Sequence, residues 1–215
     1  MTTLYWGPHT CAIGIHVLLE EIGAPYDTVK LDASGGDLQK PPFSEINPKN
    51  KVPTIVRDDG SVLTEYGSIA RWLAYAHPDA GLLPDDKEAE IRADEMMDYT
   101  VGTVHGQGFG RIFKPSKFEP NDPVHGTLGL GSGNVKAQGR EMVETGFSIL
   151  NAQLGQREFA GGARFGIADS ALFYAERWAP QTGIELPPAL AAHLARIKAR
   201  PAVQRVLEIW GEPTS

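Results

Sequence analysis

The spacing of the apolar residues changes once along this chain, near Pro78, and this change limits the folds available to it. Before Pro78, short β-type runs alternate with helical spacing. From Lys87 onward we find no convincing strand, and the apolar residues recur at helical spacing. We therefore predict three parts: a mixed domain at 1–79, a linker at 80–86 and an all-helical domain at 87–215.

The first part has the order β-α-β followed by β-β-α. Leu4-Tyr5-Trp6 and the alternating run 26–31 predict two strands, and Gly23 is placed to end the helix between them. Asp58-Asp59-Gly60 suits the turn of a β-hairpin. This order predicts a mixed sheet with helices.

Composition excludes some classes of function. The chain of 215 residues has a formal charge of -7 and no basic cluster, which argues against nucleic acid as the main partner. No window approaches the roughly 18 apolar residues of a membrane span, and no secretory signal is visible. We therefore expect a soluble, cytoplasmic protein that binds neither nucleic acid nor membrane.

Cys11 is the single cysteine, so it cannot form an internal disulfide. It follows a strand and a Gly-Pro turn and stands at the expected start of the first helix, where the backbone N–H groups favour negative charge. That position can lower the thiol pKa below its ordinary value of about 8.5 and produce a thiolate. The alternative is a small core residue without a chemical role.

Val52-Pro53 stands immediately before an expected strand. A proline held cis there turns the backbone of Val52 outward, like a free strand edge that can pair with a peptide. The alternative is a rigid turn with Lys49 and Lys51 in solvent.

Glu65 lies where another expected strand gives way to a helix. Backbone N–H groups at that helix start can bind a carboxylate, and Glu65 can accept from an ammonium group. Together they suit the head group of an α-amino acid. The alternative is an acidic residue that only stabilises the helix start.

These motifs resemble, in their order and spacing, the amino-terminal domain of the glutathione transferase superfamily. The cysteine makes the chain similar to the bacterial beta class. The similarity continues into the second half and covers nearly the whole chain. It rests on Tyr5-Trp-Gly-Pro-His-Thr-Cys11, Ile46-Asn-Pro-Lys-Asn-Lys-Val-Pro53, Leu63-Thr-Glu65, Leu82-Leu-Pro84, Gly166-Ile-Ala-Asp169 and Ala199-Arg-Pro201-Ala-Val203.

The resemblance implies a thioredoxin-like α/β domain followed by an all-α domain, with glutathione as co-substrate and no metal. In it, Val52 pairs with the cysteinyl residue of glutathione, and Lys51 or Lys40 meets the glycyl carboxylate. A homodimer is implied, with Asp98 reaching the γ-glutamyl amine across the interface. The implied catalytic residues are Cys11, Thr10 and His105, and the implied glutathione-binding residues are Tyr5, Lys40, Lys51, Val52, Pro53, Glu65, Tyr66 and Asp98.

Some positions depart from the family pattern. Tyr66 stands where many members have serine, and Gly106 stands where bacterial relatives often have lysine. Gly166 replaces the usual Ser or Thr at the start of the helix that carries Asp169, where we expect a structural role. Residues 114–133 are rich in proline and glycine and predict an irregular excursion near the second-substrate site.

The favoured function is an enzyme that conjugates the glutathione thiolate to small hydrophobic electrophiles in detoxification, with thiol-disulfide exchange through Cys11 as a further reaction. A non-enzymatic member that binds ligands or another protein is the alternative. A Cys-His hydrolase would need an oxyanion hole and an orienting acid that the sequence does not reveal. No Cys or His pair has the spacing of metal ligands.

Overall fold

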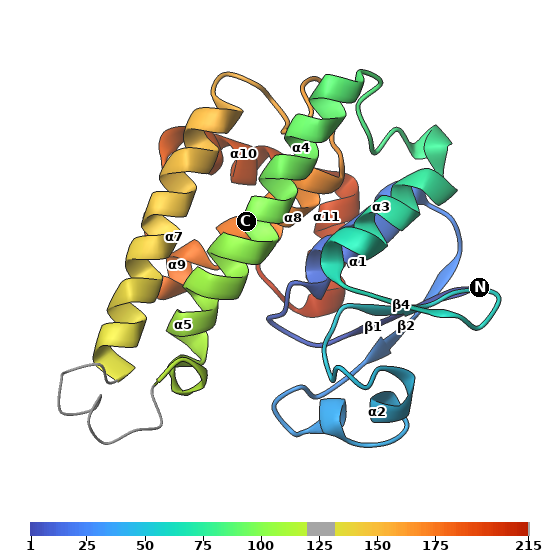
Figure 1. Cartoon of the computed structure of the whole chain (residues 1–215). Helices are drawn as coiled ribbons and strands as arrows, with labels where there is room; N and C mark the ends of the chain where they lie inside the picture. Colours follow the sequence, from blue (N-terminus) through green and yellow to red (C-terminus); the bar gives the residue numbers. More distant parts are fainter. Residues whose placement is uncertain (120–131, 215) are drawn as a thin grey trace.

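A four-stranded sheet forms the centre of the amino-terminal half of the computed structural model, which describes residues 1–119 and 132–214 (Figure 1). The strand order is β2-β1-β3-β4, with β1 parallel to β2 and antiparallel to β3. The predicted mixed sheet and hairpin are confirmed. The strands are β1 (Thr2–Trp6), β2 (Tyr26–Lys30), β3 (Thr54–Val56) and β4 (Val62–Thr64).

The two faces of β1 have different neighbours. Leu4 and Trp6 are buried in the core, whereas the ring of Tyr5 packs against Phe43 at 5.6 Å between centroids. The short helix that carries Phe43 lies on the side of the sheet opposite to the two longer helices (Figure 1). These helices are α1 (Ala12–Ile22), α2 (Phe43–Ile46) and α3 (Tyr66–Ala76).

Helix α1 ends where the sequence predicts. Gly23 has a φ of 70°, and its N–H donates to the carbonyl of Leu19 at 3.1 Å, closing the helix in the left-handed region that favours glycine. A second glycine, Gly14, lets α1 approach its neighbours closely. A Cβ atom there would lie 2.2 Å from the hydroxyl of Tyr66 and 2.6 Å from the carbonyl of Ser170.

The second half is helical, as predicted, and the described residues from Lys87 on form no strand beyond one bridge between Phe159 and Gly162. The predicted excursion at 114–133 begins with the short turn η4 (Pro115–Lys117), but most of it lies outside the described residues. The helices are α4 (Lys87–Tyr99), η3 (Thr100–Phe109), α5 (Gly110–Phe113), α7 (Ser132–Leu154), α8 (Ile167–Glu176), α9 (Ala179–Thr182), α10 (Pro188–Lys198) and α11 (Pro201–Trp210).

The segment η3 is π-helical and joins α4 to α5 in one continuous rod. Segments of π-helix are rare and recur at functional sites. Glycines bring this segment close to α7: a Cβ on Gly108 would lie 2.6 Å from Val143, and one on Gly146 would lie 2.5 Å from Val104. The π-helical segment therefore holds its side chains at a fixed distance from the long helix α7.

One continuous hydrophobic core joins the two halves. The indole of Trp6 stacks on that of Trp210 with centroids 4.3 Å apart, and Trp210 Nε1 donates to His16 Nδ1 at 2.9 Å. The last helix thus packs directly on the first strand and first helix. The linker expected at 80–86 begins on the last residue of η2 (Pro78–Ala80) and continues to the start of α4; as a boundary between separate domains it stays a prediction.

A buried ionic cluster lies within the helical half. Both nitrogens of His193 are engaged, Nδ1 with the carboxylate of Glu176 at 2.9 Å and Nε2 with Asp169 at 3.0 Å. Asp169 also accepts from the N–H of Gly166 at 2.8 Å and of Ala160 at 2.7 Å. Asp169 therefore has the structural role expected from the sequence, because it caps α8 and anchors the preceding loop.

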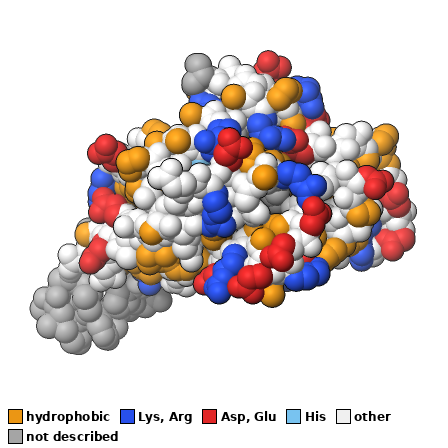
Figure 2. All heavy atoms as spheres, turned by 90° about the horizontal axis from the view of Figure 1, so that it is seen from above, with side chains coloured by type: hydrophobic (Ala, Val, Ile, Leu, Met, Phe, Trp, Pro, Cys, Tyr) orange, Lys and Arg blue, Asp and Glu red, His pale blue; other side chains and the backbone are white. Residues whose placement is uncertain are grey.

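The surface carries charges of both signs. Figure 2 shows Lys and Arg side chains interspersed with Asp and Glu on the face seen from above. Among the described helices, none combines the length and apolar character that crossing a membrane requires. No group of three or more His, Cys, Asp or Glu side chains in the described residues could hold a metal ion.

Candidate functional site

Cys11 occupies the position immediately before α1, as predicted. Its side chain is only 9% exposed, and the thiol donates a weak hydrogen bond to the carbonyl of Val52 at 3.8 Å. This contact joins the start of α1 to the loop before β3, although the two segments are 41 residues apart in the chain.

The expected lowering of the Cys11 pKa is wrong. Burial raises the pKa of the thiol to about 12, and the nearby charges of Arg177 and Lys51 offset that only in part. The sequence argument included the helix start, which lowers the pKa of the thiol, but not the removal of the thiol from water, which raises it. Cys11 is therefore a neutral thiol at physiological pH, able to donate a hydrogen bond.

The loop around Val52 is held in place by a buried side chain. The Val52–Pro53 peptide is cis, as expected for this motif. The side-chain amide of Asn47 donates to the carbonyl of Lys51 and to the hydroxyl of Thr54, both at 2.8 Å. Asn47 is 1% exposed, and the sequence reasoning assigned it no role.

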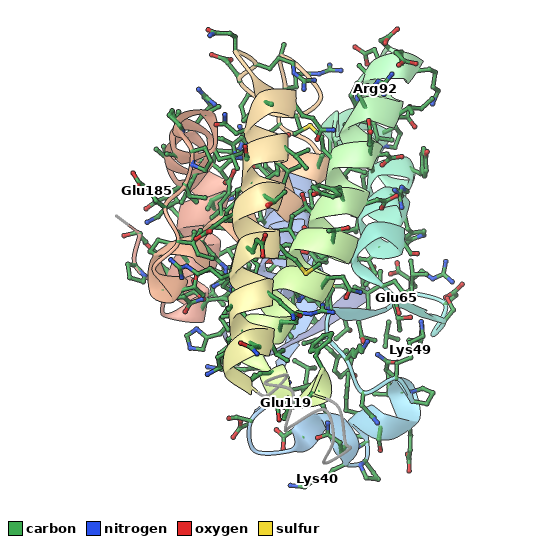
Figure 3. The ribbon with its side chains drawn as sticks, turned by 60° about the vertical axis from the view of Figure 1, so that its left-hand side comes forward. Lys40, Lys49, Glu65, Arg92, Glu119 and Glu185 are labelled. Atoms are coloured by element: carbon green, nitrogen blue, oxygen red, sulfur yellow. The ribbon has the colours of Figure 1, made fainter. Side chains whose placement is uncertain are left out.

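Glu65 links β4 to α3 in an uncommon backbone conformation, with a φ of 71°. Such conformations in residues other than glycine recur at ligand clamps. Its carboxylate pairs with Lys49 Nζ at 2.8 Å, and Figure 3 shows the two labelled side chains together at one edge of the molecule. The first N–H groups of α3, which follow directly, have no acceptor within the helix.

The side chain of Tyr66 does not point toward this edge. It is 4% exposed, and its hydroxyl bonds to Ser170 Oγ at 2.8 Å, while its ring packs on that of Tyr174. The phenol fills the junction between α1 and α8, so a contact between Tyr66 and glutathione would come from its backbone. The role of its backbone N–H stays a prediction.

The two candidate lysines differ in their surroundings. Lys51 lies close enough to Cys11 and His105 to lower the pKa of both groups. Lys40 donates to the carbonyl of Gly35 at 3.1 Å and points away from the ribbon in Figure 3. Of the two lysines, Lys51 is thus the one whose charge acts on the Cys11 thiol.

His105 projects from the π-helical segment into an aromatic cluster. Its Nδ1 is hydrogen-bonded to the hydroxyl of Tyr174 at 3.2 Å, and its ring packs edgewise on Trp178 with centroids 4.9 Å apart. Burial lowers its pKa to about 4, so the imidazole is neutral at physiological pH. Phe109 and Phe113 continue the cluster, and Phe113 is 45% exposed.

The remaining candidates are engaged within the protein. The hydroxyl of Thr10 donates to the carbonyl of Gly7 at 2.7 Å, and the ring of Tyr5 faces α2. Asp98 is exposed and accepts from Arg71 at 2.9 Å. Thr10 therefore shapes the turn before Cys11, while the roles of Tyr5 and Asp98 toward glutathione stay predictions.

Sequence reasoning missed two side chains of this region, Tyr174 and Trp178. Tyr174 is fully buried near Cys11, and both rings contact His105. Their place near the end of α8 gave no signal, because aromatic residues at helical spacing usually belong to a core.

The candidate site is defined by converging groups and lies apart from two cavities of the described structure. One cavity of about 520 Å³ lies between the ends of α1 and α3 and the β3–β4 hairpin. Another, of about 340 Å³, lies between the linker and the start of α8. Neither is lined by Cys11, Val52 or Glu65.

Comparison with known proteins identifies one family. Residues 10–76 match the model described as glutathione S-transferase, N-terminal domain, and residues 133–208 match glutathione S-transferase, C-terminal domain. Glutathione S-transferase GstA of Escherichia coli O157:H7 is 31% identical over 212 residues, covering 97% of this chain and 98% of that protein.

Two solved structures are similar over the same length. A glutathione transferase homologue from Sulfitobacter, with bound glutathione, is 26% identical with a TM-score of 0.88, covering 97% of this chain and 98% of its own. A bacterial beta class glutathione S-transferase from Sphingomonas chungbukensis is 28% identical with a TM-score of 0.80 and the same coverage.

Proposed function

This chain belongs to the glutathione S-transferase family, and from that premise we propose that it binds glutathione and transfers the tripeptide's thiolate to small hydrophobic electrophiles. One observation carries the proposal: the start of α1, the Val52 loop and the start of α3 meet around Cys11. They present a thiol, a free backbone edge and an anion-binding helix start to one ligand. A detoxifying role in the cytoplasm is part of the proposal.

We place the γ-glutamyl end of glutathione at the start of α3. Its carboxylate would accept from the first N–H groups of the helix, and its ammonium group would pair with Glu65. The ammonium group then competes with Lys49 Nζ, which forms an ion pair with the Glu65 carboxylate at 2.8 Å. The backbone of Val52 would pair with the cysteinyl residue, and Lys51 would meet the glycyl carboxylate because it is the candidate lysine whose charge acts on the Cys11 thiol.

The reacting thiolate is the ligand's. With its pKa raised to about 12, Cys11 keeps its proton at physiological pH and can donate it to the glutathione sulfur. Two adjacent thiolates would repel one another, so a neutral Cys11 favours ionisation of glutathione. Neutral His105, fixed through Nδ1 by Tyr174, faces the same region from the helical domain.

The aromatic cluster suits a flat apolar electrophile. Phe113 is exposed at the end of the row formed by His105, Phe109 and Trp178, so its ring is open to a second substrate. Such a substrate would stack on aromatic faces. The glycine-rich stretch expected near this site, 126–133, lies almost wholly outside the described residues.

A homodimer is part of the proposal. Tyr75 on α3 and Ile91 on α4 are each 60% exposed and lie on neighbouring helices, since Tyr75 donates to Glu90 at 3.1 Å. Exposed apolar side chains of this size favour an isologous interface. A monomeric mass at micromolar concentration, with full glutathione affinity, would exclude this arrangement and the role of Asp98.

The test is ligand-induced stabilisation followed by turnover. Millimolar glutathione should raise the melting temperature, because a ligand that binds only the folded state stabilises it. Glu65→Ala should reduce that shift, whereas Glu185→Ala, an exposed acid far from this edge in Figure 3, should not. Conjugation of a generic aryl halide would then distinguish an enzyme from a non-enzymatic binder, and no shift at all would contradict the proposal.

A further inference from the structure

Arg177 is a buried cation at the end of α8 that the mechanism above does not use. Its side chain is 9% exposed, and its Nε has no hydrogen-bond partner among the described residues. A guanidinium removed from water is costly unless its charge is paired. Arg177 therefore depends on the two groups that its remaining nitrogens contact.

One of those groups is the carboxylate of Glu212, which accepts from Arg177 Nη1 with both oxygens, at 2.7 and 2.8 Å. Glu212 follows α11 after Gly211, which has a φ of 67°. The N–H of Glu212 donates back to the carbonyl of Leu207 at 2.9 Å. The chain terminus is thereby folded so that an acidic side chain reaches the buried arginine.

The other group is the backbone carbonyl of Thr10, which accepts from Arg177 Nη2 at 2.7 Å. This carbonyl belongs to the peptide that leads into Cys11. The Thr10 hydroxyl is held by Gly7 on the other side of the turn, so the turn is fixed from both sides. The Arg177 charge is also close enough to favour ionisation of the Cys11 thiol.

The other groups near the thiol are few. Lys51 favours the charged form and Glu65 opposes it, while the phenols of Tyr66 and Tyr174 lie close by in neutral form. On the far side of Arg177, the exposed His9 approaches Glu212 at 3.9 Å. Among these side chains, Arg177 is the cation that hydrogen-bonds to a backbone group of the Cys11 turn.

We propose that Arg177, held by Glu212, is a positioning residue that orients the Thr10–Cys11 peptide and sets the reactivity of the Cys11 thiol, so that the carboxyl-terminal tail tunes the site. The inference rests on the proposed function for its catalytic meaning. Two observed interactions support it: the hydrogen bond from Arg177 to the Thr10 carbonyl and the effect of the Arg177 charge on the Cys11 thiol.

The two partners should act in opposite directions. Removing the Arg177 charge takes away a field that stabilises the thiolate, so the thiol becomes less reactive. Removing the Glu212 charge takes away the anion that partly neutralises Arg177. The positive charge then acts more strongly on the thiol, which becomes more reactive. A contact that only supported the fold would shift reactivity in the same direction in both variants.

The test uses the fact that Cys11 is the only cysteine, so any thiol modification reports on it. Alkylation by iodoacetamide is followed by mass spectrometry at one fixed pH in the native protein, Arg177→Met, Arg177→Lys and Glu212→Gln. We expect the alkylation rate to fall by at least about threefold in Arg177→Met and to rise by at least about threefold in Glu212→Gln, since half a pKa unit corresponds to that factor. Arg177→Lys should fall between Arg177→Met and the native protein.

Ultraviolet absorbance of the thiolate, read against Cys11→Ser as a function of pH, should shift in the same directions. Equal rates, or a change of the same sign in Arg177→Met and Glu212→Gln, would overturn the proposal. If Arg177→Met does not fold, Glu212→Gln decides, because its amide can still accept from Arg177. Glutathione-induced stabilisation of the native protein is measured in parallel; its absence would contradict the proposed function and leave the alkylation comparison valid.

Discussion

Two histidines that hydrogen-bond to side chains of α8 differ in charge. His105 bonds to the hydroxyl of Tyr174 and packs on Trp178, and burial lowers its pKa to about 4. His193 lies between Glu176 and Asp169, whose carboxylates outweigh its burial and raise its pKa to about 10. The first is a neutral ring beside the candidate site, and the second is an imidazolium in the core.

The difference shows that burial alone does not decide the charge of a histidine. The hydrogen-bond partner of the ring decides it: a hydroxyl leaves it neutral, and carboxylates keep it charged. Helix α8 supplies both partners. Tyr174 and Glu176 are two residues apart, so they leave the helix on different sides. The same helix therefore provides a hydroxyl toward the site and a carboxylate toward the interior.

The largest test of this contrast is stability. His193→Gln leaves two buried carboxylates without their cation, and we expect the free energy of unfolding to fall by about 3–5 kcal/mol. His105→Gln should cost about 1 kcal/mol, because it loses one neutral hydrogen bond. Urea denaturation at neutral pH and equal protein concentration measures both, with the exposed His9→Gln as control.

The double variant His193→Leu, Glu176→Leu removes opposite charges together and should recover part of that loss. If His193→Gln and His105→Gln lost equal stability, the contrast between a charged and a neutral histidine would be wrong.

The next test is the pH dependence of stability. The pairing of His193 is fully present below pH 6.5, the ordinary value, and is lost as pH rises toward about 10, because the unfolded chain gives up its proton first. His105 acts on the acid side: between pH 6.5 and about 4 only the unfolded chain binds the proton, so stability falls as pH falls. Each changes stability by at most about 1.4 kcal/mol per pH unit.

Melting temperature measured across this range should therefore lose its alkaline decline in His193→Gln. The acid decline should be reduced, not abolished, in His105→Gln, because burial also lowers the pKa of His16 to about 4. An unchanged alkaline slope in the His193 variant would show that this histidine is not charged in the folded protein.

A smaller effect is expected at Cys11. Because its pKa is raised to about 12, Cys11→Ala removes a hydrogen-bond donor rather than a nucleophile, and aryl halide conjugation should fall by about fivefold. Incubation with oxidised glutathione at alkaline pH, where a fraction of Cys11 is ionised, should add one glutathionyl group to the native protein, releasing one glutathione, and none to the variant, as read by mass spectrometry. Complete loss of conjugation in Cys11→Ala would instead make Cys11 the reacting thiolate.

The smallest effect is expected at Tyr174. Tyr174→Phe keeps the ring contacts of His105 and removes only the hydroxyl at 3.2 Å. We expect kcat/KM to fall by about twofold to fivefold with little change in melting temperature, since one neutral hydrogen bond is lost. A large loss of stability in Tyr174→Phe would instead make the hydroxyl structural.

The sequence predicted the features that depend on local chemistry. Gly23 ended α1 and Gly60 turned the hairpin, each with positive φ, because those signals need only neighbouring residues. The charge of Cys11 could not be predicted in the same way, since its desolvation comes from both halves of the chain. Likewise a structural role was expected for the motif that carries Asp169, but the two residues that complete its ionic cluster are known only from the folded structure.

The stacking of Trp6 on Trp210 has a consequence for how the chain is made. A ribosome adds roughly 5–20 residues per second, so the first strand waits on the order of 10–40 seconds before its indole partner is synthesised. During that time Trp6 and His16 lack the neighbour that covers them in the finished protein. The nascent amino-terminal half therefore lacks the cover of its aromatic pair until synthesis is nearly finished, and a stop codon shortly before Trp210 would leave Trp6 and His16 without that cover permanently.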